Sequence, residues 1–133
     1  KDILQDCQRA VRFIRYHANK YSIDPDHIGA FGYSSGATLC SMLGVTDLTD
    51  TAQKTGVDAM SSKVQAVVTL AARFDLSDFN KSGDTAIQTP TISSVLLNYM
   101  GELPAVENGN YVLSGKYAEA SPITYVDKED ASF

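Results

Sequence analysis

The sequence lacks several features that define large classes of protein. It contains no apolar run of the ~18 residues that a membrane-spanning helix requires, so we expect no membrane span. Its two cysteines, Cys7 and Cys40, are too few for a disulfide scaffold, and both are expected on helical faces as small apolar residues. No Cys and His spacing typical of a metal site occurs, so neither a metal nor a cofactor is predicted.

Basic charge is also scarce, with 11 Lys and Arg against 16 Asp and Glu and a formal net charge of −5. This balance argues against nucleic acid as a partner. The chain opens without a methionine and in the middle of a helical pattern. We therefore predict that the 133 residues are an internal part of a longer polypeptide, called the full-length protein below. The sequence predicts neither its compartment nor its oligomeric state.

The first half of the chain predicts a strand–helix–strand unit. Residues 2–20 show the apolar spacing of an amphipathic helix, whose polar residues include Arg12 and Arg15. Residues 27–32 and 64–72 are predicted buried strands, and residues 34–43 are a predicted helix ended by Gly44. Two apolar strands joined through a helix indicate a parallel α/β sheet.

The second half is less regular. Residues 92–100 predict a short helix that stops at Gly101, and residues 117–120 predict another helical turn. This stretch leaves the carboxyl end of the second strand, which is the edge where open α/β sheets bind ligands. We therefore expect a cap-like excursion that shapes the substrate site, mainly through residues 76–114.

Chemistry is indicated by Gly32-Tyr33-Ser34-Ser35-Gly36, which fits the pattern G-x-S-x-G between a predicted strand and a predicted helix. So tight a turn strains the serine, and side chains two positions before and after it would collide, which explains both glycines. Ser34 is the predicted nucleophile, the Ser35 backbone N–H is the predicted oxyanion donor, and Tyr33 is expected beside the acyl group. Ser35 is rejected as nucleophile because Tyr33 would then stand where a tiny residue is needed. The alternative is a glycine-rich turn of another α/β fold, although no phosphate-loop pattern is present.

Several segments around this motif resemble one protein family. They are residues 6–15, 17–21, 23–29, 64–68, 74–76 and 120–126. Together they resemble the acetyl-esterase and feruloyl-esterase-like branch of the α/β-hydrolases. The resemblance implies a partial α/β-hydrolase fold within one domain. Residues 1–74 would form the nucleophile core, 75–120 the cap-like excursion, and 121–133 the approach to the next strand.

The remaining catalytic groups of a serine hydrolase are not evident. No histidine follows Ser34, and we expect His17 to pack on its helix and His27 to lie ~23 Å from Ser34 at the far end of the sheet. Asp75 follows the second strand and is a weak candidate for the acid, with loop capping as its alternative role. Asp127 and Asp130 are predicted to be loop acids at the wrong end of the sheet.

The expected function is a serine carboxylesterase that hydrolyses small acyl esters through an acyl-enzyme on Ser34. Its acid and its histidine base would lie outside this chain, so the chain alone is expected to be inactive. A peptidase or lipase on the same fold remains open, because a fold does not determine a substrate. A non-catalytic binding module on a hydrolase scaffold is the alternative from another class.

Overall fold

The structure is a computed structural model that describes residues 2–47, 55–77, 90–108, 110–128 and 130–131. Its centre is a pair of parallel strands, β1 (Gly29–Tyr33) and β2 (Ala66–Leu70), whose register runs from Gly29 opposite Ala66 to Tyr33 opposite Leu70. The predicted strand–helix–strand unit is thereby confirmed. The predicted second strand is longer than the observed one, because Ala71 adopts a positive φ of 57° and leaves the extended conformation directly after Leu70.

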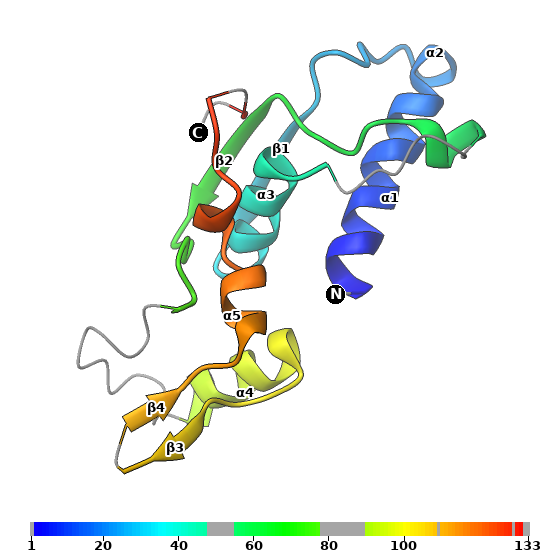
Figure 1. Ribbon diagram of the computed structural model, residues 1–133. Helices are drawn as coiled ribbons and strands as arrows, with labels where there is room; N and C mark the ends of the chain where they lie inside the picture. Colours follow the sequence, from blue (N-terminus) through cyan, green and yellow to red (C-terminus); the bar gives the residue numbers. More distant parts are fainter. Residues whose placement is uncertain (1, 48–54, 78–89, 109, 129, 132–133) are drawn as a thin grey trace.

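Helices α1 (Asp2–Tyr16) and α3 (Ser35–Val45) pack on the same face of this sheet, as Figure 1 shows. The core between these layers consists of Val11, Ile28, Leu43, Val64 and Val67, with Cys7 and Cys40 packed against it. Both cysteines are free and partly buried, and burial raises the pKa of each thiol. They are therefore small apolar packing residues, as the sequence predicts.

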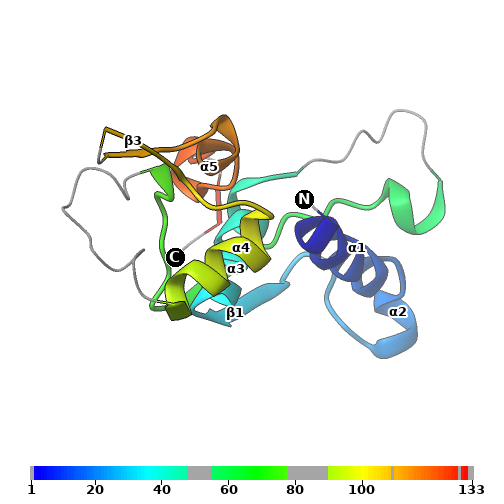
Figure 2. The ribbon, with the colours of Figure 1, turned by 90° about the horizontal axis from the view of Figure 1, so that it is seen from below.

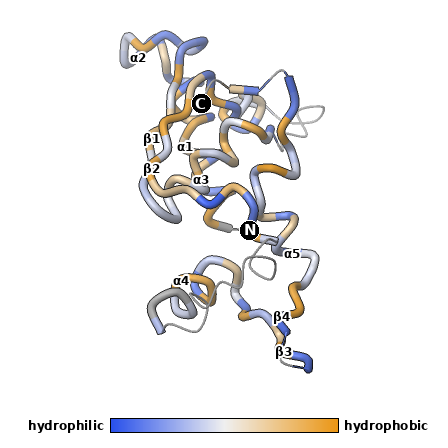
Figure 3. Tube along the Cα trace, turned by 90° about the vertical axis from the view of Figure 1, so that its left-hand side faces the viewer, coloured by the Kyte–Doolittle hydropathy of each residue, from blue (hydrophilic) through white to orange (hydrophobic). Residues whose placement is uncertain are grey.

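The opposite face of the sheet is open among the described residues, although both strands were predicted to be buried. Its side chains are large and apolar: Phe31, Tyr33, Val68 and Leu70 are 50–69% exposed. Figure 3 shows hydrophobic colour on stretches of both strands, interrupted by paler residues. Successive residues of a strand face opposite sides, so helices on one face leave this second apolar set uncovered.

The predicted helix over residues 2–20 is divided at His17 into α1 and the short α2 (Ala18–Tyr21), which ends at Ser22 with a φ of 54°. Arg12 and Arg15 do not lie on a solvated face. Arg12 is only 8% exposed, and Arg15 donates hydrogen bonds to the carbonyl oxygens of Pro25 and Lys63, both at 2.9 Å. Because these carbonyls belong to the connections before β1 and β2, Arg15 attaches α1 to the amino end of the sheet.

Gly44 does not end α3, contrary to the prediction. The helix continues to Val45 and ends where the backbone of Thr46 becomes extended. Thr46 donates both its N–H (2.9 Å) and its hydroxyl (2.6 Å) to the carbonyl of Met42, which satisfies that carbonyl at the end of the helix. Gly44 is buried within the helix, where its carbonyl accepts the N–H of Ala131 at 3.2 Å. The glycine thus lies where the C-terminal segment approaches the helix backbone.

The excursion after β2 forms a separate cluster below the carboxyl ends of the strands (Figures 1 and 2). Its elements are α4 (Pro90–Met100), a hairpin of β3 (Ala105–Glu107) and β4 (Asn110–Val112), and α5 (Gly115–Glu119). The 3₁₀ turn η5 (Pro122–Thr124) follows α5 and contacts α3. The helix stop at Gly101 is confirmed by its φ of 74°, whereas the hairpin was not predicted. Residues 78–89 of the expected cap lie outside the described residues.

A buried serine closes the base of this excursion. Ser121 is 1% exposed, and its hydroxyl accepts the N–H of Leu76 and donates to the carbonyl of Tyr117, both at 2.7 Å. Leu76, Leu96 and Tyr117 form the small core that these bonds adjoin. Chain positions 45 residues apart are thus held together by one side chain.

We predict that Ser121→Ala destabilises this base by about 1–3 kcal/mol, because the buried Leu76 N–H loses its acceptor. Amide exchange of Leu76 in the full-length protein measures the effect. Thr124→Ala is the matched control, since it removes an exposed hydroxyl that also donates to a backbone carbonyl, that of Ala118. Equal exchange rates in the two variants would show that Ser121 does not close the excursion.

Candidate active site

The turn from β1 into α3 holds Ser34 in an unusual backbone conformation. Ser34 is the single residue between Tyr33, which ends β1, and Ser35, which begins α3, and its φ and ψ are 56° and −126°. A non-glycine residue in such a region carries strain, and strain of this kind is concentrated at functional sites. The predicted strained serine is present, and its side chain is exposed.

Gly32 makes this turn possible. A Cβ at Gly32 would lie 2.4 Å from the carbonyl oxygen of Gly36 and 2.7 Å from the amide nitrogen of Ala37. These are backbone atoms, so no side-chain rotation could relieve the contact. The expected collision at Gly36 is not found: beyond its chain neighbours and the backbone of its own helix, a Cβ there would meet no described atom within 4 Å. Only position 32 is therefore sterically restricted at this turn, because the backbone of Gly36 leaves no room for a side chain at Gly32.

Hydrogen bonds fix Ser34 from both sides. Its N–H donates to the carbonyl of Leu70 at 2.9 Å, which extends the pairing of β1 with β2 by one residue. Its carbonyl accepts the N–H groups of Ala37 at 2.9 Å and Thr38 at 3.2 Å. The Ser34 backbone is thus tied to both the sheet and α3, while its hydroxyl lies at the exposed carboxyl edge.

Ser35 occupies the first position of α3. The first N–H groups of a helix have no acceptor within that helix, and they carry the positive end of the helix dipole. The Ser35 N–H is therefore a donor adjacent to the Ser34 hydroxyl, where negative charge would be stabilised. Tyr33, the predicted neighbour of the acyl group, is 69% exposed on the outward face of the sheet.

Neither histidine lies at this edge. His17 links α1 to α2, and its ring contacts those of Phe13 and Tyr16 at centroid distances of 4.4 Å and 5.0 Å. His27 precedes β1 in a turn, exposed, where Nδ1 lies 2.8 Å from the Asp24 carboxylate. The expected place of His27 before the strand is confirmed, although the strand begins at Gly29 rather than at His27. His17 packs on neighbouring rings at the junction of two helices rather than within one helix. Figure 1 shows α2 at the amino end of the strands, away from the excursion.

The acidic candidates have structural partners. Asp75 accepts hydrogen bonds from the N–H (2.8 Å) and hydroxyl (2.5 Å) of Ser77, so it stabilises the loop after β2. This geometry matches the capping role that was the alternative to catalysis. Asp130 forms a 2.7 Å ion pair with Lys63 and also accepts the N–H of Asp127. Both Asp127 and Asp130 thus belong to a loop at the amino end of β2.

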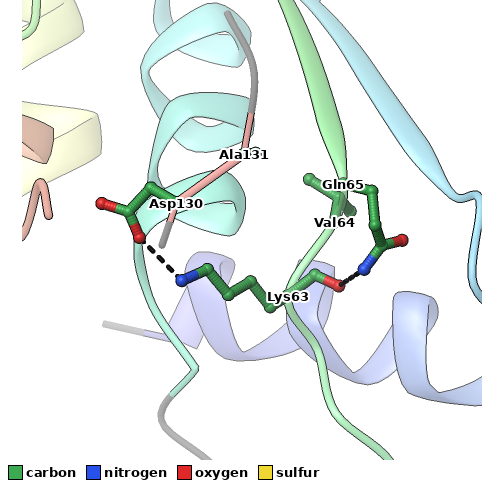
Figure 4. Close-up of a pocket in the computed structure, with 5 residues that line it drawn as sticks. All are labelled: Lys63, Val64, Gln65, Asp130 and Ala131. Carbon is green, nitrogen blue, oxygen red and sulfur yellow. Dashed lines mark hydrogen bonds and ion pairs between the residues drawn. The ribbon is translucent and has the colours of Figure 1, made fainter. Parts of the chain in front are cut away.

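A small pocket lies beside this ion pair, lined by Lys63, Val64, Gln65, Asp130 and Ala131 (Figure 4). Burial works to raise the pKa of Asp130, but hydrogen bonds from Lys63 and the Asp127 N–H, with the Lys63 charge, outweigh it and lower the pKa. The pocket is at the opposite end of β2 from Leu70, whose carbonyl binds Ser34. It is therefore separate from the candidate active site.

The loop that leaves β2 contributes contacts that sequence reasoning missed. Thr38 of α3 donates its hydroxyl to the carbonyl of Arg73 at 3.3 Å, and Ile123 donates its N–H to the carbonyl of Phe74 at 3.1 Å. Backbone acceptors of this kind leave no pattern in the sequence. They hold the loop between α3 and the base of the excursion.

No group of three or more potential metal ligands occurs among the described residues, and none of their helices is long and apolar enough to cross a membrane. A parallel sheet, a strained serine between strand and helix, and a helix N-terminus beneath it define the α/β-hydrolase class. The comparisons agree with this class. The BD-FAE family model matches residues 2–133, and the chain belongs to this family.

Several relatives of this chain are named for ester hydrolysis. A probable carboxylic ester hydrolase, LipM of Mycobacterium tuberculosis (strain ATCC 25618 / H37Rv), is 26% identical over 132 residues, which are 99% of this chain and 28% of that protein. An acetyl ester-xyloside bifunctional hydrolase from Caldicellulosiruptor lactoaceticus superposes with a TM-score of 0.72 at 23% identity, over 96% of this chain and 40% of the other.

A bifunctional GH43-CE protein of Bacteroides eggerthii superposes with a TM-score of 0.68 at 32% identity, over 96% of this chain and 17% of the other. The chain thus spans less than half the length of each of these three proteins. Their similarity places the chain in an esterase family with an α/β-hydrolase fold.

We predict that Gly32→Ala and Gly36→Ala have opposite consequences, although each adds one methyl group. The first forces the turn apart and should cost at least about 1–3 kcal/mol. The second adds a helix-favouring residue in open space and should be neutral or stabilising by up to ~1 kcal/mol. Thermal unfolding of the full-length variants measures both. A destabilised Gly36→Ala variant would show that chain outside the described residues packs against this position.

We also predict that the ion pair at Asp130 makes stability depend on acid pH. The pKa of Asp130 is lower in the folded protein than its unfolded value of about 3.9, so its stabilisation is present above that value and is lost as the pH falls through the folded pKa. Asp130→Asn should cost about 1–2 kcal/mol at pH 7, because Lys63 stays partly hydrated.

Urea unfolding of the full-length protein from pH 7 to pH 3 measures this effect, and the gap between wild type and Asp130→Asn should shrink toward pH 3. Glu119→Gln, at an exposed helical position, serves as control. If the difference in free energy of unfolding between wild type and Asp130→Asn stays the same down to pH 3, the charge of Asp130 is not the origin of that difference.

Proposed function

We propose that Ser34 is the nucleophile of a carboxylic ester hydrolase that acts on small acyl esters through an acyl-enzyme. The observation that carries this proposal is the conformation of Ser34, strained at a φ of 56° and exposed at the carboxyl edge of a parallel sheet. Serine is a common residue at the start of a helix, but the Ser34 side chain makes no capping hydrogen bond to α3. Its N–H and carbonyl would make the same bonds in another residue, so these contacts do not explain the hydroxyl.

The reaction begins when the Ser34 hydroxyl oxygen attacks the carbonyl carbon of the ester. A histidine base outside this chain takes the hydroxyl proton, and the carbonyl oxygen becomes an oxyanion that accepts the Ser35 N–H. One such donor is typically worth ~2.7–4 kcal/mol in the transition state. The carbon–oxygen bond to the alcohol then breaks, and the alcohol leaves with the proton from the histidine. Water repeats the sequence on the acyl-enzyme, releases the acid and restores the Ser34 hydroxyl.

The names of structural neighbours support a substrate class for this proposal. One neighbour is named for acetyl ester hydrolysis and another is named a carbohydrate esterase, which supports acetyl or related small acyl groups on polysaccharide. Tyr33 and the excursion that begins at Asp75 would shape the substrate site. The acid and the base are supplied from outside the 133 residues, so the isolated chain is expected to lack activity.

One observation favours a second function. His17 and His27 both lie at the amino end of β1, so the chain itself supplies Ser34 with no base. A binding module on a hydrolase scaffold would look the same. An acid followed by a histidine in the later strands of the full-length protein would favour the enzyme.

The test is labelling of the full-length protein with a fluorophosphonate, with the modified residue mapped by mass spectrometry. We expect the label on Ser34, and its complete loss in Ser34→Ala, because only an activated serine reacts at a useful rate.

Ser35→Ala is the matched control, because it removes the neighbouring hydroxyl and retains the backbone N–H that the proposal uses. It should keep the label within a few-fold of wild type. A folded wild-type protein that takes no label would contradict the esterase proposal and favour the binding module.

A further inference from the structure

The residue that faces Ser34 across the sheet edge is Ala71. The register of the two strands ends with Tyr33 opposite Leu70, and the Ser34 N–H donates to the Leu70 carbonyl at 2.9 Å. Ser34 and Ala71 are therefore the next residues along β1 and β2. They stand side by side where the two strands end.

Both of these residues have a positive φ, 56° for Ser34 and 57° for Ala71. The other described non-glycine residues with positive φ occupy ordinary places, since Ser22 caps α2 and Asn108 lies in the β3–β4 turn. Alanine has no polar side chain to compensate for a left-handed conformation, so its presence there is costly. An outlier of this kind beside a strained serine indicates a functional constraint.

The chain after Ala71 is held by contacts on both of its sides. Thr38 of α3 binds the Arg73 carbonyl, and Ile123 binds the Phe74 carbonyl. Ser121 then binds the Leu76 N–H. Ala71 itself is exposed, and these contacts restrain the loop that follows it.

We infer that Ala71 determines which acyl groups Ser34 accepts. This inference rests on the proposed function. In the acyl-enzyme the acyl carbon is bonded to the Ser34 oxygen, whereas the alcohol has left, so the residue beside Ser34 meets the acyl group in both half-reactions. A methyl group leaves that space open, and the positive φ turns the following chain out of the strand direction. A larger side chain at position 71 fills the space.

The test uses substitutions that the backbone can accommodate. Asparagine tolerates positive φ and adds bulk, and glycine tolerates it and removes the methyl group. Ala71→Asn and Ala71→Gly are compared with Ala66→Asn, which makes the same chemical change at the exposed amino end of β2. The substrates are p-nitrophenyl acetate, butyrate and hexanoate, which share one alcohol, and the full-length protein is used.

In Ala71→Asn, kcat/KM for the butyrate and hexanoate should fall about tenfold or more relative to the acetate. Ala71→Gly should raise the same ratio, and Ala66→Asn should leave it unchanged. If kcat/KM for the longer esters relative to the acetate is the same in wild type and all three variants, Ala71 does not determine acyl specificity. If Ala71→Asn does not fold, an unchanged value of this ratio in Ala71→Gly would overturn the inference in the same way. A wild type that hydrolyses no ester and takes no fluorophosphonate label would overturn the proposed function itself.

Discussion

The described structure depends on one backbone contact, the approach of Gly32 to the peptide that joins Gly36 to Ala37. At this distance no side chain can stand at position 32, and the chain reverses from strand into helix within a single residue. That reversal lays α3 back across β1 and β2, so the helix covers the same sheet face as α1. It also leaves Ser34 no relaxed conformation. Packing of the core and strain at the serine therefore have a common origin.

The two ends of the sheet carry different kinds of interaction. At the amino end, charged groups are engaged in structural bonds: Arg15 binds loop carbonyls, and Asp130 pairs with Lys63. At the carboxyl end, strained backbone and exposed small side chains meet at Ser34 and Ala71. These charged groups bind the connections that precede both strands, while the backbone pairing of β1 with β2 sets the register that brings Ser34 beside Ala71. The contacts of Arg15 and Asp130 stabilise the amino end of the sheet, and the candidate active site lies at its carboxyl end.

The sequence predicted those features that depend on local sterics and apolar patterning. The strand–helix–strand order, the strain at Ser34, the need for Gly32 and the stop at Gly101 all follow from residues near each feature. Long-range partners were not predictable. Arg12 and Arg15 look like solvent-facing residues of α1 until the connections before the strands are placed against them. Gly44 looks like a helix terminator in the sequence. Its actual role, a contact with Ala131, could not be foreseen because Ala131 is 87 positions away in the chain. The three-residue strands of the hairpin are too short to produce an alternating pattern. The roles of Ser34 as nucleophile and of the Ser35 N–H as oxyanion donor stay predictions.

The hydrogen bonds of Ser121 at the base of the excursion have a consequence for how proteins with this fold can diversify. The hydroxyl of Ser121 joins the two ends of the excursion, and the entropic cost of closing a loop grows only slowly with its length. Insertions that leave the core of Leu76, Leu96 and Tyr117 intact should therefore cost little, while Leu76 and Ser121 keep the ends at a fixed spacing. The base of the excursion is then a site at which evolution or an engineer can add a substrate-recognition segment without disturbing the turn at Ser34.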